Sequence, residues 1–91
     1  MDRYKIPRIN SSFIAEEFED ELLLFNEEGE KALYLNDTAQ AVLQLCGDDL
    51  SVGQIIEFLQ QKYPDNQDEI VDDVIEVLAT LESNGVISFK I

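Results

Sequence analysis

The sequence predicts an α+β fold in which a three-stranded antiparallel sheet precedes three helices. The main observation is a change of period at Asn36: short strand-like segments lie between Phe13 and Leu35, and from Asn36 onward apolar residues recur at spacings of three and four. The second is composition. Of the 91 residues, 45% are hydrophobic and 29% charged, which is enough apolar material for one packed core. We therefore expect a single domain.

The first 12 residues show no periodic pattern. Pro7 cannot donate a backbone hydrogen bond, and the Asn-Ser-Ser run at 10–12 is typical of a turn or a cap. We expect residues 1–12 to form an irregular, flexible lead-in and residues 13–91 to form the domain.

Three short segments after this lead-in are typical of strands. They are FIAEEF (13–18), ELLLFN (21–26) and KALYLN (31–36), and acidic or glycine-containing breaks separate them. Short breaks of this kind join antiparallel neighbours. Gly29 can supply the positive φ that the second hairpin loop needs.

Capping residues mark the first two helices. We expect the first over 37–46, with Asp37 as its N-cap. The second begins with a capping box made by Ser51 and Gln54, and Pro64 ends it. Both segments carry one apolar stripe, so each should turn one face to the core.

The third helix has the broadest apolar arc. We expect it over 67–84, with Asn66 as its N-cap and Gly85 in the left-handed position after its end. Its apolar arc covers roughly 160°, wider than the roughly 100° that a surface helix buries. One edge should therefore remain as an apolar rim. The final VISFKI (86–91) is typical of a short closing strand.

The charge of the chain excludes several partners. It has 20 acidic and 6 basic side chains, a net charge of -14. Such a surface repels nucleic-acid phosphates and anionic lipids. No apolar run approaches the roughly 18 residues that span a bilayer, and the N-terminus lacks the apolar region of a secretory signal. We expect a cytoplasmic protein that binds neither nucleic acid nor membrane.

Residue patterns for catalysis or metal binding are missing. The sequence has no His, so the single Cys, Cys46, has no imidazole base to activate it, and a zinc site lacks ligands. Phosphate-binding loops, dinucleotide fingerprints and calcium-loop spacings are also absent. We expect no catalytic residue, no metal and no cofactor.

Several short motifs follow one another in order between residues 35 and 85. They are Leu35-Asn36 with Thr38-Ala39, Leu45 with Gly47, Ser51-Val52 leading through Ile55 and Leu59 to Tyr63, and Asp73-Val74 with Leu78, Leu81 and Gly85. Their order and spacing resemble the PqqD-like family, the small proteins of pyrroloquinoline quinone biosynthesis and their relatives called RiPP recognition elements. The resemblance covers most of residues 13–87.

The resemblance implies a winged helix-turn-helix-like fold and a binding function without catalysis. Family members bind the leader segment of a ribosomally made precursor peptide. They present the peptide to a modifying enzyme, often a radical SAM enzyme, or to a leader peptidase in lasso-peptide pathways. The leader adds as a strand beside the third strand and packs against the third helix. The peptide-binding residues so implied are Lys31, Ala32, Leu33, Tyr34 and Leu35 on the strand, and Ile70, Asp73, Val74 and Val77 on the helix.

The residue types give this implied groove a physical basis. An edge strand offers unpaired N–H and C=O groups to an added strand. The apolar rim of the third helix can receive apolar anchors, and Asp73 can pair with a Lys or Arg of the leader. Alternatives remain open: Leu33, Leu35 and Val74 can instead be core residues, and Asp73 a solvated one.

Two other functions fit the same order of elements. A winged-helix transcription factor has this helix order, but the third helix contains no Lys or Arg to meet phosphates. An acidic domain that binds a basic protein is the other alternative. We expect a monomer or a weak dimer, since an exposed edge strand can pair with a second copy.

Overall fold

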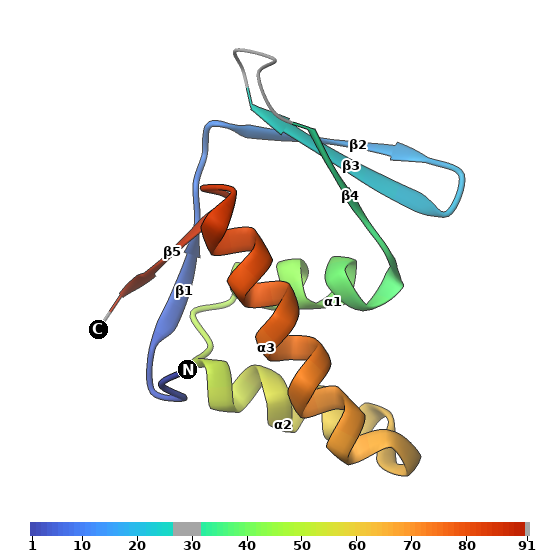
Figure 1. Ribbon diagram of the computed structural model, residues 1–91, viewed down its shortest axis with the longest axis vertical. Coiled ribbons are helices and arrows are strands. Elements are labelled where there is room, and N and C mark those ends of the chain that lie inside the picture. The colour runs from blue at the N-terminus through green and yellow to red at the C-terminus, as the bar shows by residue number, and fades with distance from the viewer. Residues whose placement is uncertain (27–31, 91) are drawn as a thin grey trace.

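The computed structural model describes residues 1–26 and 32–90, which form an α+β fold with two antiparallel sheets and three α-helices (Figure 1). The predicted α+β class is confirmed, whereas the predicted strand count is not, because a two-stranded sheet accompanies the three-stranded one. Strands β2, β3 and β4 form a meander, and β1 pairs with β5 in a separate two-stranded sheet. The elements in order are β1 (Ile6–Ile9), β2 (Phe13–Phe18), β3 (Glu21–Asn26), β4 (Ala32–Leu35), α1 (Asp37–Cys46), α2 (Val52–Lys62), the 3₁₀-helix η1 (Pro64–Asn66), α3 (Gln67–Ser83) and β5 (Ile87–Lys90).

The N-terminal segment forms a strand, contrary to the expected irregular lead-in. β1 pairs antiparallel with β5, and Pro7, which lies opposite Phe89, is fully buried. A two-stranded ribbon leaves one edge of each strand unpaired, so it accommodates a residue that has no N–H. The prediction for residues 1–12 is therefore wrong at residues 6–9. The expected closing strand exists, and β1 is its partner.

The residues before β1 also complete the start of α2. The first N–H groups of a helix have no partner within the helix. Val52 donates its N–H to the Lys5 carbonyl and Gly53 donates to the Arg3 carbonyl, both at 2.9 Å. A Cβ at Gly53 would lie 3.3 Å from the Arg3 oxygen, so the small residue permits this close approach. The N-terminal segment thus stabilises two elements distant in sequence.

Two of the predicted helix ends have the expected chemistry. The capping box of α2 is present: Ser51 Oγ accepts from the Gln54 N–H at 3.2 Å, and the Ser51 N–H donates to Gln54 Oε1 at 2.9 Å. After α3, Gly85 has a φ of +76°, the left-handed conformation that glycine adopts without strain. Gly29, the glycine predicted for the second hairpin, lies outside the described residues.

Two other N-caps differ from the prediction. α1 is capped by Asn36, whose Oδ1 accepts from the Ala39 N–H at 2.9 Å, while Asp37 is already the first helical residue. Asn36 has the extended backbone that a cap requires. At α3, Asn66 makes no side-chain cap, because the chain enters the helix directly from the 3₁₀ turn of η1.

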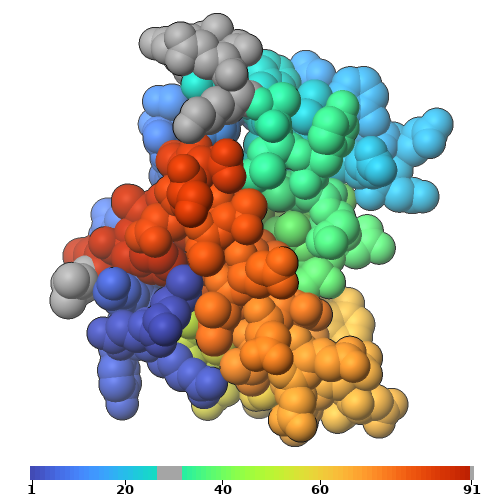
Figure 2. Space-filling model, in the orientation of Figure 1, coloured from blue at the N-terminus to red at the C-terminus, as the bar shows by residue number. Residues whose placement is uncertain are grey.

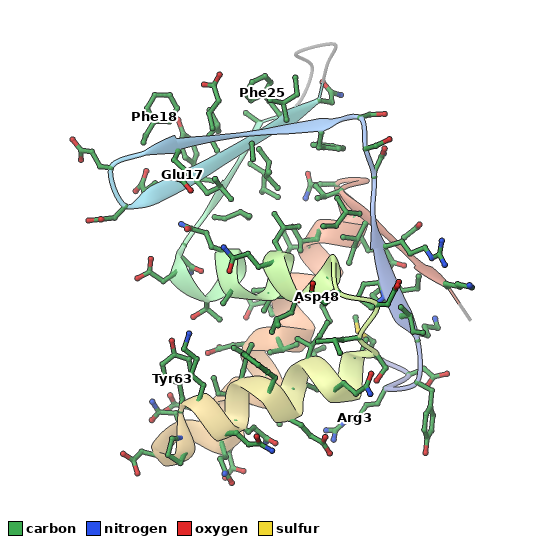
Figure 3. The ribbon with its side chains drawn as sticks, turned by 180° about the vertical axis from the view of Figure 1, so that it is seen from behind. Arg3, Glu17, Phe18, Phe25, Asp48 and Tyr63 are labelled. Atoms are coloured by element: carbon green, nitrogen blue, oxygen red, sulfur yellow. The ribbon has the colours of Figure 1, made fainter. Side chains whose placement is uncertain are left out.

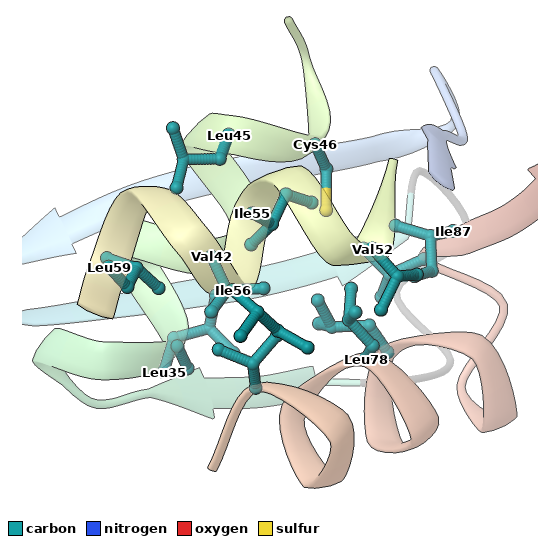
Figure 4. Close-up of a cluster of buried hydrophobic side chains, with 14 of the residues drawn as sticks. Leu35, Val42, Leu45, Cys46, Val52, Ile55, Ile56, Leu59, Leu78 and Ile87 are labelled. Carbon is teal, nitrogen blue, oxygen red and sulfur yellow. The ribbon is translucent and has the colours of Figure 1, made fainter. Parts of the chain in front are cut away.

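The core lies between the helices, with the three-stranded sheet at its edge. Figure 4 shows side chains of α1, α2 and α3 packed together, with Leu35 of β4 and Ile87 of β5 beside them. Within the described part of β2, β3 and β4, only Leu24 and Leu35 are buried. The sheet therefore touches the core along a narrow line and leaves most of its area outside it.

Candidate functional site

A groove of about 250 Å³ lies between β4 and the C-terminal half of α3. Figure 2 shows the orange surface of α3 next to the green surface of β4 and α1, where these walls meet. The start of α1 forms the third side. The lining residues are Leu33, Tyr34, Leu35, Asn36, Thr38, Ala39, Asp73, Glu76, Val77, Thr80 and Leu81.

The β4 wall is an edge strand. Within the described part of the chain, β4 pairs only with β3, so its other edge has no neighbouring strand. Gln40 of α1 donates its side-chain N–H to the Leu35 carbonyl at 3.0 Å and to the Asp20 carbonyl at 3.2 Å. One backbone acceptor at the end of β4 is thus occupied. The edge that can receive another strand is the segment 32–34.

The predicted strand residues lie where alternation places them. Leu35 is buried, Leu33 is half-buried, and both line the groove, so they contact the core as well as the groove. Ala32 and Tyr34 are exposed, Tyr34 by 68%. Lys31 lies outside the described residues.

The helix side of the site differs from the prediction. Ile70 and Val74 are 7% and 0% exposed, so both are core residues. The assignment of Ile70 to an exposed rim is wrong, and for Val74 the alternative of a core residue is the correct one. The reason is that two helices, α1 and α2, pack against α3 and together cover most of its wide apolar arc. Val77 remains half-buried at the edge of the groove, and Asp73 lies exposed beside it.

Several groove residues were not predicted. Glu76 and Thr80 follow Asp73 at helical spacing and extend the same wall. Asn36, Thr38 and Ala39 form the end wall at the start of α1. Two signals could have identified them: the three- and four-residue spacing along α3, and the motif that carries the family resemblance at the first helix.

The groove combines an apolar floor with a negative rim. Val77, Leu33 and Leu81 supply apolar surface, while Asp73 and Glu76 supply two carboxylates. No Lys, Arg or His lines it among the described residues. A cavity with these walls suits an apolar side chain with a cationic group nearby.

The described residues contain no buried charged site. All buried side chains in this part of the chain are apolar, apart from the thiol of Cys46. No group of three or more His, Cys, Asp or Glu side chains is arranged there to hold a metal ion. Nor does any helix in residues 1–26 and 32–90 combine the length and apolar character needed to cross a membrane.

Burial raises the pKa of the Cys46 thiol from 9.0 to about 12. Between pH 9 and pH 12 the Cys46 thiol loses its proton in the unfolded chain and keeps it in the native state, so the unfolded state binds fewer protons. We therefore expect the free energy of unfolding to fall above pH 9 by about 1.4 kcal/mol per pH unit. Urea unfolding at pH 9 and 10 should show this extra loss in the wild type and not in Cys46→Ala. The prediction would be contradicted if the free energy of unfolding fell equally between pH 9 and pH 10 in the two proteins.

Comparisons with known proteins give one family match and two structures of similar fold. The family model described as Coenzyme PQQ synthesis protein D (PqqD) matches residues 21–87, which contain both walls of the groove. None of the curated proteins matches the sequence.

Two solved structures have the same fold. The structure of lasso peptide synthetase B1 complexed with the leader peptide is 21% identical, with a TM-score of 0.75, and the match covers 91% of this chain and 98% of that one. The structure of TbiB1 in complex with the TbiA(beta) leader peptide is 15% identical, with a TM-score of 0.73, and the match covers 89% and 94%.

Proposed function

Since the chain belongs to the PqqD family, we propose that it binds the leader segment of a ribosomally synthesised precursor peptide and presents that peptide to a separate enzyme. The observation that carries this proposal is the groove, in which an edge strand lies beside a half-buried apolar residue, Val77, and a carboxylate, Asp73. Two proteins of the same fold were solved with leader peptides bound.

The leader binds as an additional strand beside β4. Its backbone satisfies the free N–H and C=O groups of segment 32–34, which supplies affinity for an extended peptide of almost any sequence. Alternate side chains of an extended peptide point to one side. Those on the groove side contact Leu33, Val77 and the start of α1, so the groove selects apolar anchors.

The rim of the groove adds a preference for positive charge. Asp73 and Glu76 lie four and one residues before Val77 and line the same wall. A Lys or Arg placed next to the apolar anchor can pair with either carboxylate. We therefore propose that the bound leader contains a basic residue near its apolar anchors.

The chain acts as an adaptor in this role. The enzyme that receives the peptide is a modifying enzyme such as a radical SAM enzyme, or a leader peptidase. The alternative function, a winged-helix DNA-binding regulator, would place α3 against phosphates, but α3 has no Lys or Arg and carries the carboxylates Asp68, Glu69, Asp72, Asp73, Glu76 and Glu82. Nucleic-acid binding through α3 is disfavoured by this charge.

Calorimetric titration with synthetic leader segments, taken from precursor-like reading frames encoded beside the gene, tests the proposal. We expect saturable binding of one segment at about 1 μM or tighter and no binding of an unrelated peptide. Affinity should fall as salt rises from about 50 to about 300 mM, because the rim charges are exposed and screened. Asp73→Asn should weaken binding about threefold at low salt.

The matched control for that substitution is Asp72→Asn. Asp72 is also exposed on α3 and its replacement changes the net charge equally, but it does not line the groove. The affinity of Asp72→Asn for the leader should stay within about twofold of the wild-type affinity. Equal effects of the two variants would show that only net charge matters, and the absence of binding by any segment would refute the proposed function.

A further inference from the structure

The three-stranded sheet has a second face that none of the helices in residues 1–26 and 32–90 covers. Residues directly opposite each other in an antiparallel ladder point to the same side. Ile14 lies opposite Phe25, and Leu23 lies opposite Tyr34. The side chains of Leu24 and Leu35 point to the other side and reach the core. In Figure 1 the helices all lie on that core side of the sheet. The side that the described helices leave uncovered, called the outer face here, is formed by Ile14, Glu16, Phe18, Glu21, Leu23, Phe25, Ala32 and Tyr34.

Most side chains of the outer face are apolar. Ile14, Phe18 and Tyr34 are 43%, 53% and 68% exposed, and Leu23 and Phe25 are half-buried. Figure 3 shows Phe18 and Phe25 projecting away from the helices, whereas Glu17 projects from the opposite side. Single exposed apolar residues are ordinary on protein surfaces, but a group that includes three aromatic rings on one face is typical of an interface.

The border of the outer face is negative. Residues 16–21 contain five carboxylates around Phe18, and two of them, Glu16 and Glu21, lie on the outer face itself. The described residues of β2, β3 and β4 contain no Lys or Arg. Among the described residues, the outer face therefore combines apolar side chains with carboxylates on β2 and at the start of β3, and no basic side chain lies on it. A complementary surface has apolar side chains with Lys and Arg beside them.

We propose that the outer face docks a separate protein whose contact surface carries apolar side chains surrounded by Lys and Arg. If the proposed function holds, on which this identification of the partner rests, that protein is the enzyme that receives the peptide. β3 and β4 separate β2 from the groove, so Ile14 and Phe18 lie on the strand farthest from the leader. The leader and the enzyme can therefore bind at the same time.

The negative charge of the outer face disfavours two other binding partners there, a second copy of the chain and an anionic membrane. A second copy would bring another chain of net charge -14 to the face and place carboxylates near Glu16 and Glu21. An anionic membrane would meet the same carboxylates with its own negative surface. A basic-bordered protein satisfies both the apolar centre and the charged border.

The test is the affinity for the full chain of any modifying enzyme or leader peptidase found to be encoded beside its gene, measured by biolayer interferometry with the purified proteins. Phe18→Ser and Ile14→Ser should each weaken binding at least about tenfold, because exposed aromatic and aliphatic anchors dominate such interfaces. The double variant Glu16→Lys, Glu21→Lys changes only exposed positions and should weaken binding about threefold. The matched control is Phe58→Ser: Phe58 is 52% exposed, but it lies on α2.

Three results of the binding assay would overturn the inference. They are an enzyme that does not bind the wild type, unchanged affinity in the β2 variants, and an equal loss in Phe58→Ser. Sedimentation velocity gives a further test: if the wild type is a dimer and Phe18→Ser is a monomer, a second copy occupies the outer face, and this result would also overturn the inference. Titration with the leader separates the two proposals. If Phe18→Ser binds the leader normally and has lost enzyme binding, both proposals are supported. If the wild type does not bind the leader, only the proposed function is refuted.

Discussion

Val77→Asp is expected to weaken leader binding at least about 30-fold, equivalent to about 2 kcal/mol. Val77 is half-buried at the edge of the groove, where an apolar anchor of the leader would contact it. A bound peptide would remove the new carboxylate from water without a partner, and desolvation of an unpaired charge is costly. Asp73, one helical turn earlier, adds a like charge. Isothermal calorimetry with the identified leader measures the effect.

The control for this variant is Val71→Asp. Val71 is also a half-buried valine of α3 that packs against the core, but it does not line the groove. Both variants should lose a similar free energy of unfolding in urea, about 1–2 kcal/mol. Only Val77→Asp should lose leader binding. If Val71→Asp lost binding equally, the groove between β4 and α3 would not be the binding site.

Deleting residues 1–9 is expected to lower the free energy of unfolding by about 3–5 kcal/mol. The deletion removes β1 with its buried Pro7 and exposes Val86 and Ile87, which are 1% and 3% exposed in the intact chain. It also removes the carbonyls of Arg3 and Lys5 that accept from the start of α2, each worth about 1 kcal/mol. Thermal unfolding should show a Tm lower by on the order of 15 °C.

A chain that lacks only residues 1–2 is the control for the deletion. Met1 and Asp2 are exposed, and their removal leaves β1 and both carbonyls in place. We expect its free energy of unfolding to stay within about 0.5 kcal/mol of the full chain. If the longer deletion were equally harmless, the N-terminal segment would be the flexible lead-in that the sequence alone predicts.

Local patterns in the sequence determined the elements between Phe13 and Ser83 and, for several of them, their limits. The strands at 13–18 and 21–26 and the helix at 37–46 occupy the predicted residues. The capping box of Ser51 and Gln54 and the left-handed Gly85 were also identified, because caps and periodicity act between residues three or four positions apart. The strand edge of the groove followed from the family resemblance together with alternation along 31–36.

Only the tertiary structure decided the features that depend on distant partners. β1 is a strand because β5, near the other end of the described chain, pairs with it, and no local signal at Pro7 predicts that partner. Ile70 and Val74 have the same periodicity as Val77, but α1 and α2 cover the first two and leave the third at the groove. Helix periodicity specifies which residues share a face, whereas packing of the other elements determines how much of that face remains free to bind a partner.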